Sequence, residues 1–481
     1  MLRRFIICQL SVIILAGCFF SCEDSDDFSS DPNLRVSFST DTIRFDTVFT
    51  SFGSATRRFV VRNTNNNSLT LSSVELASGG TSGFRINVDG ISGTAINNVD
   101  ILKKDSIYVF VEVTIDPLNG NAPVLVRDSI RFNLNGRAQY VQLEAVGQDV
   151  VLWRGKRFTQ NTTLLAGKPI LVYDSLVVDT NAVLTIEKGA KLFFHKGAGM
   201  TVYGSLNVRG TLDKPVVFRG DRTDNIFTTV PYDKVPGQWE GIVIDSVSYN
   251  NNFNYLYLRN SLKGIWFKPS LPSPKKAVIA NSIVQNTNLH GIYAINADID
   301  FQNSLFANAG GSVVKLIGGS YTFVHCTLAN YMSWWNMRRD AALTIGNVSD
   351  DGERYIEMSR CEFLNTIIAG SGFAEVVYQN KIYEAEKEIS QYFENCLIKS
   401  AGEDDAEFVN IVWDIDPEFS NINKERNYYY SYDLDSISPA INKANPDFSV
   451  SLPKDIRGVS RLSDDAPDIG CYEWVAKKEE E

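Results

Sequence analysis

The chain is poor in the residues on which many catalytic and scaffold sites depend. Its 481 residues include only 3 histidines and 7 cysteines. His195, His290 and His325 stand far apart, and the sequence has no zinc-ligand spacing, Ser–His–Asp set or phosphate-binding glycine loop, so histidine-based catalysis is poorly supported. The cysteines beyond residue 22 are too few for a disulfide scaffold, and we expect them to be small buried apolar residues: Cys326, Cys361, Cys396 and Cys471.

Basic charge and long apolar runs are also scarce. The 46 Lys and Arg residues against 57 Asp and Glu residues give a formal net charge of −11. This balance disfavours nucleic acid and other polyanions as partners, because their phosphates bind mainly to Lys and Arg. No apolar run after residue 22 is long enough to span a bilayer, so we expect that part of the chain to be soluble.

The one long apolar segment lies at the N-terminus. Arg3 and Arg4 precede the apolar residues 5–20, and acidic residues follow at 23–27, which is typical of an export signal. Residues 19–22 resemble the lipobox of bacterial lipoproteins, which implies a lipid on Cys22, with Cys18 as the alternative. We therefore expect a signal peptide over 1–21, an acidic tether over 22–33, and a protein anchored by its lipid in the outer membrane, facing the cell exterior.

Residues 34–148 have the pattern of a β-sandwich. Short strands with alternating apolar residues are separated by turn sequences at 63–67, 79–80 and 119–121. This spacing is typical of antiparallel sandwiches. In their order, the segments 43–49, 60–64, 113–117 and 143–147 resemble the immunoglobulin-like family of Hydin, ASPM and SPD-2 proteins. The resemblance covers about 110 residues and implies a spacer or interaction module rather than an enzyme.

Residues 149–415 contain an internal repeat of short strands and glycine turns. Asn286, Asn308 and Asn330 fall 22 residues apart, and the pattern continues through Cys361 and Cys396 in steps of 35 residues. A parallel β-helix accounts for such a repeat, because each coil must stack on the next to bury its apolar side. We expect an asparagine ladder of Asn286, Asn308, Asn330 and Asn365, and a column of small residues at Ser282, Ser304, Cys326, Cys361 and Cys396.

The C-terminal part has its own motif. Asp416-Pro417, Ser438-Pro439-Ala440 and Pro467-Asp468-Ile469-Gly470 resemble the endings of many secreted β-helix proteins. The wider chain resembles the right-handed parallel β-helix superfamily that includes pectate lyases. The expected fold is therefore all-β, with an immunoglobulin-like sandwich, a right-handed parallel β-helix and a C-terminal cap over 416–475 that covers the open end of the helix, followed by a charged tail over 476–481.

Few residues are candidates for catalysis. Asp298 and Asp300 lie on one side of an expected strand, where two carboxylates could act as acid and base. The order of motifs found in polygalacturonase-like enzymes is missing around them, so they are weak candidates. Residues 350–354 have the acids and arginine that calcium-dependent lyase chemistry needs, although an exposed turn is the simpler interpretation. We expect no cofactor, and calcium enters only in the lyase alternative.

An insertion after Asn330 is the better candidate for binding. It combines Trp334 and Trp335 with Arg338 and Arg339. Aromatic faces stack on sugar rings and arginine forms paired bonds with carboxylates, although the two tryptophans could instead cover the side of the helix. A second insertion, 382–389, has the pattern of a short amphipathic helix.

Asp followed by Ser or Thr and an aliphatic residue recurs along the chain. The triplet resembles an O-glycosylation acceptor of some Gram-negative bacteria, and its hydroxyl residues are Thr42, Thr47, Ser106, Ser129, Ser175, Ser246 and Ser436. Together the patterns predict a surface lipoprotein whose β-helix binds an extracellular polysaccharide or surface protein without cleaving it. A polysaccharide lyase or glycosidase is the enzyme alternative, and a structural envelope protein is the third.

Overall fold

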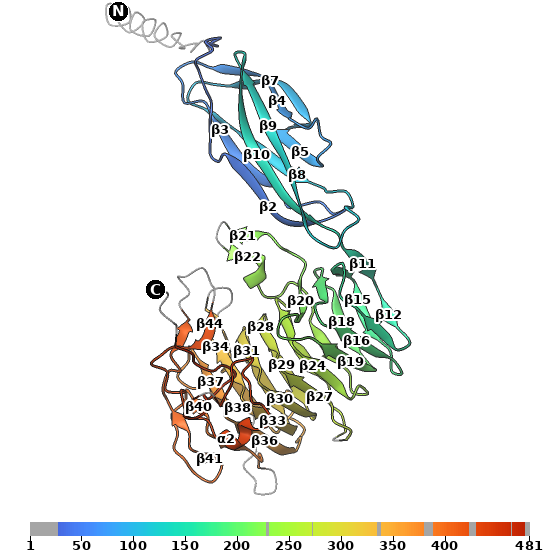
Figure 1. The fold of residues 1–481 in the computed structure, drawn as a ribbon, viewed down its shortest axis with the longest axis vertical. Coiled ribbons are helices and arrows are strands. Elements are labelled where there is room, and N and C mark those ends of the chain that lie inside the picture. Colours follow the sequence, from blue (N-terminus) through green and yellow to red (C-terminus); the bar gives the residue numbers. More distant parts are fainter. Residues whose placement is uncertain are drawn as a thin grey trace, which may run out of the picture. The chain divides into compact units, whose positions relative to one another are not determined.

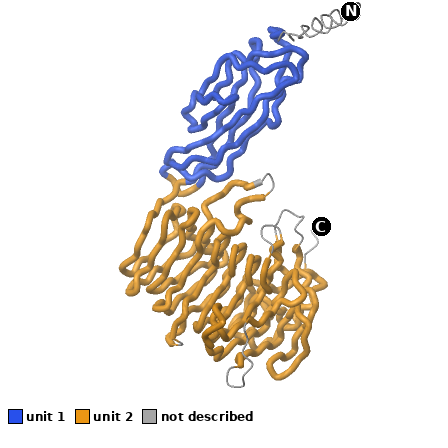
Figure 2. The backbone as a smooth tube through the Cα atoms, turned by 180° about the vertical axis from the view of Figure 1, so that it is seen from behind, with its two compact units in different colours: residues 1–119, 123–148 blue, residues 120–122, 149–481 orange. Residues whose placement is uncertain are grey.

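The computed structural model describes residues 27–227, 230–271, 273–333, 338–379, 388–422, 430–462 and 464–476. The chain divides into two compact units, residues 1–119 with 123–148 and residues 120–122 with 149–481 (Figure 2). Each unit encloses its own hydrophobic core. Within the described residues, no helix has the length and apolar character needed to cross a membrane.

The first unit is an immunoglobulin-like β-sandwich, as predicted (Figure 1). One sheet has the strand order β1 (Ser37–Phe38), β3 (Arg57–Arg62), β8 (Ser106–Val113), β5 (Phe84–Val88) and β6 (Ile91–Gly93). The other has the order β2 (Thr42–Phe49), β10 (Arg137–Gln148), β9 (Val124–Leu134), β4 (Leu69–Leu76) and β7 (Ala95–Ile101). Alternate residues of each strand enter the core between the sheets. The pairing is not wholly antiparallel, because β2 runs parallel to β10.

The second unit is a parallel β-helix built from three parallel sheets, which confirms the predicted fold class. Sheet I consists of β11 (Val151–Arg154), β14 (Ile170–Tyr173), β17 (Lys191–Phe194), β20 (Val216–Gly220), β25 (Leu256–Arg259), β28 (Ile283–Thr287), β31 (Leu305–Ala309), β34 (Thr327–Asn330), β37 (Ile367–Gly370), β40 (Leu397–Ile398) and β42 (Val412–Trp413).

Sheet II consists of β12 (Arg157–Phe158), β15 (Ser175–Val178), β18 (Gly199–Val202), β23 (Ile242–Ile244), β26 (Ile265–Phe267), β29 (Ile292–Ile295), β32 (Val314–Ile317), β35 (Leu343–Gly346) and β38 (Val376–Gln379). Sheet III consists of β13 (Thr162–Leu164), β16 (Val183–Glu187), β19 (Ser205–Arg209), β24 (Asn251–Asn254), β27 (Ala277–Ala280), β30 (Asp298–Gln302), β33 (Gly319–Val324), β36 (Met358–Leu364), β39 (Tyr392–Glu394) and β41 (Phe408–Val409). A hairpin of β21 (Asn225–Phe227) and β22 (Val230–Pro231) and a 3-10 turn, Tyr232–Lys234, interrupt the coils.

A stack of phenylalanines fills the interior along sheet III. Successive ring centroids are 4.2, 4.6, 4.7 and 4.7 Å apart, and the rings are almost parallel. These spacings match the distance between neighbouring strands, since the same position of each coil supplies one ring. The stack therefore marks the true register of the coils, and its members are Phe301, Phe323, Phe363, Phe393 and Phe408.

The predicted register between two of the coils was wrong. Strand β33 pairs with β36 so that Phe323 lies beside Phe363, which places Asn365 after His325 and Thr366 after Cys326 in the stack. Cys361 instead pairs with Tyr321 and belongs to another column. The equal spacing of the three cysteines was a coincidence of two unequal insertions, and the small-residue column contains Thr366 in place of Cys361.

The observed asparagine ladder also differs from the predicted one. Asn286, Asn308 and Asn330 do lie in register on sheet I, but the next residue in their column is Gly370, not Asn365. Asn365 belongs to the turns that join sheet III to sheet I. Those turns need a left-handed backbone, which asparagine adopts more easily than most residues. The turn column, with φ between 46° and 51°, consists of Asn281, Asn303, His325, Asn365 and Asn395.

The C-terminal segment covers the side of the β-helix rather than its end, contrary to our expectation. It contains β43 (Phe419–Asn421), β44 (Ser431–Leu434) and the short helix α2 (Pro446–Ser449), drawn in orange and red in Figure 1. Its apolar residues pack on the outward side of sheet I, over β31, β34, β37 and β40. The reason lies in sheet I itself, whose outward residues there are apolar and need a cover: Leu305, Ala307, Ala329, Ile367, Ala369 and Leu397.

Candidate ligand-binding surface

The outward side of sheet II carries a column of aromatic and polar side chains. Trp266, Tyr293, Lys315 and Thr344 come from four successive coils and are neighbours in the strand register. Because every second residue of a strand faces outward, each coil contributes one side chain to this line. We call these four residues the sheet II column. Trp266 is half-buried, whereas Tyr293, Lys315 and Thr344 are buried.

An acidic loop residue closes over the middle of the column. Asp350 accepts hydrogen bonds from the hydroxyl of Tyr293 and from Lys315 Nζ, the latter at 2.9 Å. Although burial opposes it, these two donors hold the pKa of Asp350 below its usual value. Burial and the bond to Asp350 raise the pKa of Tyr293. Asp350 is therefore a carboxylate, and Tyr293 keeps its proton.

A neutral histidine stands beside this group. The backbone N–H of Ser312 donates to His290 Nδ1 at 3.0 Å, and the imidazole centroid lies 5.5 Å from the ring of Tyr293. Burial, followed by the charge of Lys315, lowers the pKa of His290. With Nδ1 acting as an acceptor, the neutral ring carries its proton on Nε2. His290 thus presents a hydrogen-bond donor, not a general base, from Nε2.

Trp266 forms the other end of the column. Its ring meets Tyr293 edge to face at 5.0 Å, and Lys263 Nζ lies 5.0 Å from its centroid. The indole N–H is buried and has no hydrogen-bond partner within the described residues. Beside Asp350, a cavity of about 700 Å³ is lined by Ile295, Asn296, Arg354 and others. No residue of the column lines this cavity, but an unpaired donor beside an aromatic face is a feature of a surface that binds a polar ring.

The structure places the arginines of the predicted binding insertion differently. Arg338 forms a paired salt bridge with Glu375, at 2.7 Å for both bonds, and also donates to the carbonyl of Asn330 at 2.7 Å. These bonds anchor the insertion to the coils. Arg339 is exposed, and its backbone N–H donates to Gly310 at 2.9 Å. Trp334 and Trp335 lie outside the described residues, as does most of the insertion 382–389.

The weak catalytic candidates lie on another side of the helix. Asp298 and Asp300 face outward from β30 in sheet III, so they are not part of the sheet II column. Lys275 Nζ bonds to Asp300 and lies 3.8 Å from Asp298, and Arg360 is 3.8 Å from Asp298. The two carboxylates are therefore shared among cations as an ion-pair network. Sequence reasoning missed the sheet II column, because its members share no residue type.

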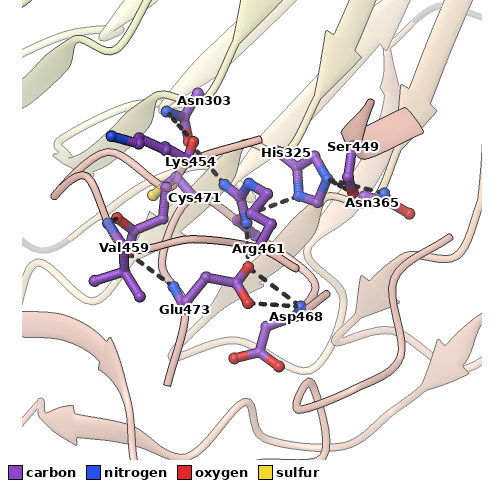
Figure 3. Close-up of polar contacts among 12 residues, drawn as sticks. Asn303, His325, Asn365, Ser449, Lys454, Val459, Arg461, Asp468, Cys471 and Glu473 are labelled. Carbon is purple, nitrogen blue, oxygen red and sulfur yellow. Dashed lines mark hydrogen bonds and ion pairs between the residues drawn. The ribbon is translucent and has the colours of Figure 1, made fainter. Parts of the chain in front are cut away.

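A buried histidine and serine lie in contact where the C-terminal segment meets the turn column (Figure 3). His325 Nε2 is 2.7 Å from Ser449 Oγ, and Nδ1 donates to the carbonyl of Gly470 at 3.2 Å. Both side chains are completely buried. Burial also lowers the pKa of His325, so the ring is neutral. The pair is therefore a buried contact that joins the segment to the helix.

The cysteines and the acidic clusters offer no metal site in the described part of the chain. Cys326, Cys361, Cys396 and Cys471 are unpaired and buried, and burial raises the pKa of each thiol. No group of three or more His, Cys, Asp or Glu residues is arranged to hold a metal ion within the described ranges. The thiols act as small apolar residues of the packing.

The predicted modification sites differ in exposure, and both candidate lipid sites, Cys18 and Cys22, lie outside the described residues. Of the seven hydroxyl residues, Ser106, Ser175 and Ser436 are exposed, whereas Thr42, Thr47, Ser129 and Ser246 are half-buried. A glycosyltransferase that acts on the folded protein would therefore reach the first three most easily.

Comparisons with known proteins give no family. No family model and no curated protein matches the chain. A family 123 glycoside hydrolase from Clostridium perfringens aligns over 25% of this chain and 30% of its own, with 8% identity and a TM-score of 0.18. The PapD-like domain 7 of human CEP192 aligns over 25% of this chain and 89% of its own, with 10% identity and a TM-score of 0.18. At these scores neither likeness carries an argument.

Proposed function

We propose that the protein is a lipoprotein of the outer membrane that faces the cell exterior and binds an extracellular glycan or partner protein through the sheet II column. The observation that carries the proposal is the buried indole N–H of Trp266, which has no hydrogen-bond partner among the described residues and lies in the column next to Tyr293. Aromatic rings with a few convergent polar groups are typical of ligand sites. The protein would then belong with the surface lipoproteins of the pectate-lyase-like superfamily.

A glycan array with the full chain tests binding. Trp266→Phe keeps most of the aromatic surface but removes the N–H donor, and Trp266→Ala removes both. We expect at least a tenfold loss of affinity for Trp266→Ala and a smaller loss for Trp266→Phe, since a well-packed aromatic contact contributes more than about 1.4 kcal/mol. Phe373→Ala is the matched control, because that ring is 98% exposed. Equal binding by all four proteins would contradict the proposal.

A catalytic role is the second candidate, because Tyr293, Asp350, Lys315 and His290 converge. A polysaccharide lyase or glycosidase would release unsaturated products or new reducing ends from uronic or neutral polysaccharides, and only the lyase reaction would call for calcium. Tyr293→Phe should abolish such activity. A purely structural envelope protein, the third candidate, binds no glycan at all.

The lipid anchor is tested in the native host. We expect Cys22→Ser to move the protein from the detergent phase to the aqueous phase in detergent partitioning, because the acyl chains hold it at the membrane. Cys18→Ser should partition like the unchanged protein. The opposite result for the two variants would place the lipid on Cys18.

A further inference from the structure

The sandwich has aromatic residues on the side that does not form its core. In strand β8, Ile107, Val109 and Val111 are buried, while Tyr108 and Phe110 face outward. The two outward rings lie 6.2 Å apart at an angle of 30°. Arg58 stacks over Tyr108 at 5.3 Å, which leaves Phe110 as the ring that lines a pocket. Core packing does not account for an aromatic residue at this position.

Phe110 lies in a pocket of about 630 Å³ on this side of the sheet. Strand β5 supplies Arg85 and Asn87, and the register sets Asn87 beside Phe110 and Arg85 beside Glu112. Asn87 is oriented by Ser92, to which its Nδ2 donates at 2.9 Å. Arg85 has no hydrogen-bond or ion-pair partner among the residues that the structure describes, although Glu112 is its neighbour.

The pocket thus surrounds one aromatic ring with both hydrogen-bond donors and hydrogen-bond acceptors. The guanidinium of Arg85 only donates, the carboxylate of Glu112 only accepts, and the amide of Asn87 does both. Sugar hydroxyls donate and accept, and the C–H side of a pyranose packs on an aromatic face. The opposite charges of Arg85 and Glu112 give the pocket no net charge, so the set favours a neutral sugar over an acidic one.

We propose that the sandwich pocket binds a neutral pyranose residue of an extracellular glycan, with Phe110 as the stacking platform and Arg85, Asn87 and Glu112 as its hydroxyl partners. The domain expected to be a spacer then takes part in recognition. This site is independent of the sheet II column, because it lies in the other unit and shares no residue with it.

The two sites are distinguishable by fluorescence. Every one of the 7 tryptophans lies at or after Trp153, so the sandwich contains none. A sugar on the sandwich leaves tryptophan emission unchanged, whereas a ligand on the sheet II column alters it through Trp266. Calorimetry detects binding at either site.

The experiment titrates the full chain with neutral oligosaccharides of glucose, galactose, mannose and N-acetylglucosamine, and with hexuronic acid oligosaccharides of equal length. We expect a neutral oligosaccharide to bind, with about a tenfold loss for Phe110→Ala and for Arg85→Ala. Tyr140→Ala, which removes a 49% exposed ring from the opposite sheet, should bind normally. Melting curves of the variants establish that each is folded.

Three results would overturn this inference and leave the proposal for the sheet II column standing. They are that no neutral oligosaccharide binds at millimolar concentration, that Phe110→Ala binds like the unchanged protein, or that only Trp266→Ala loses binding. A preference for the hexuronic acids is a fourth such result, because a pocket without net charge should not favour an acidic sugar. Loss of binding in Phe110→Ala but not in Trp266→Ala would support the sandwich site even if the β-helix binds nothing.

Discussion

At the residue scale, the neighbouring residues Arg338 and Arg339 differ in exposure and in pairing. Arg338 is 15% exposed in its side chain and pairs with Glu375, whose side chain is 0% exposed. Glu375 also accepts the backbone N–H groups of Gly372 at 2.6 Å and Ala342 at 2.8 Å. A buried carboxylate in this position depends on its guanidinium, because removal of one partner leaves an uncompensated charge. Arg339 is exposed.

We therefore expect Arg338→Ala to lower the free energy of unfolding of the β-helix by about 3–5 kcal/mol. Arg339→Ala is the control and should change it by less than about 0.5 kcal/mol. Urea unfolding followed by tryptophan emission measures the β-helix alone, since all the tryptophans lie in that unit. Equal urea midpoints of unfolding for the two variants would show that the pair of Arg338 and Glu375 does not stabilise the coils.

At the element scale, the repeats that share a residue type could be predicted from the sequence. The sequences Phe301-Gln302-Asn303-Ser304 and Phe393-Glu394-Asn395-Cys396 match because each coil needs an inward ring, a left-handed turn and a small residue in order. Phe363-Leu364-Asn365-Thr366 completes this set. Its register is hard to recognise in the sequence because Cys361 matches the spacing of the other cysteines, whereas the phenylalanine stack gives the correct register.

The sheet II column could not be predicted in the same way. Trp266, Tyr293, Lys315 and Thr344 follow one another at intervals of 27, 22 and 29 residues. Insertions between coils change the interval, and outward positions are not restricted to one residue type by packing. The acid that joins them, Asp350, comes from a loop whose path the sequence does not specify. Only the stacked register brings these side chains together.

The C-terminal segment supplies a second prediction at this scale. Ala440 is completely buried within the cluster that covers sheet I, whereas Ile437, three residues earlier, is 72% exposed. Ala440→Asp should detach the segment, because a buried unpaired carboxylate costs several kcal/mol. We expect increased binding of an apolar dye and faster proteolysis between residues 416 and 475. Ile437→Asp, which adds the same charge at an exposed position, should behave like the unchanged protein.

At the scale of the whole molecule, buried ionisable groups in that segment link stability to pH. Arg461 is 0% exposed, bonds to Glu473 and donates to Asn303 Oδ1 at 2.7 Å (Figure 3). Burial raises the pKa of Glu473 to about 7, despite the charge of Arg461, and burial also raises the pKa of Asp468. His325 acts in the opposite direction, because burial lowers its pKa. Protonation of the two acids favours the folded state, and protonation of His325 disfavours it.

The contribution of Glu473 can be isolated by Glu473→Gln. The folded pKa of Glu473, about 7, lies above its ordinary value of 4.5, so the folded state holds this proton more tightly. Its stabilising contribution is complete below pH 4.5 and is lost as the pH rises to 7, a change of up to about 3 kcal/mol. The unfolding free energy of the unchanged protein should therefore fall over this range relative to that of Glu473→Gln, whose amide does not titrate. Glu403→Gln, at an exposed acid, should show a constant difference, and a constant difference for both variants would exclude the linkage.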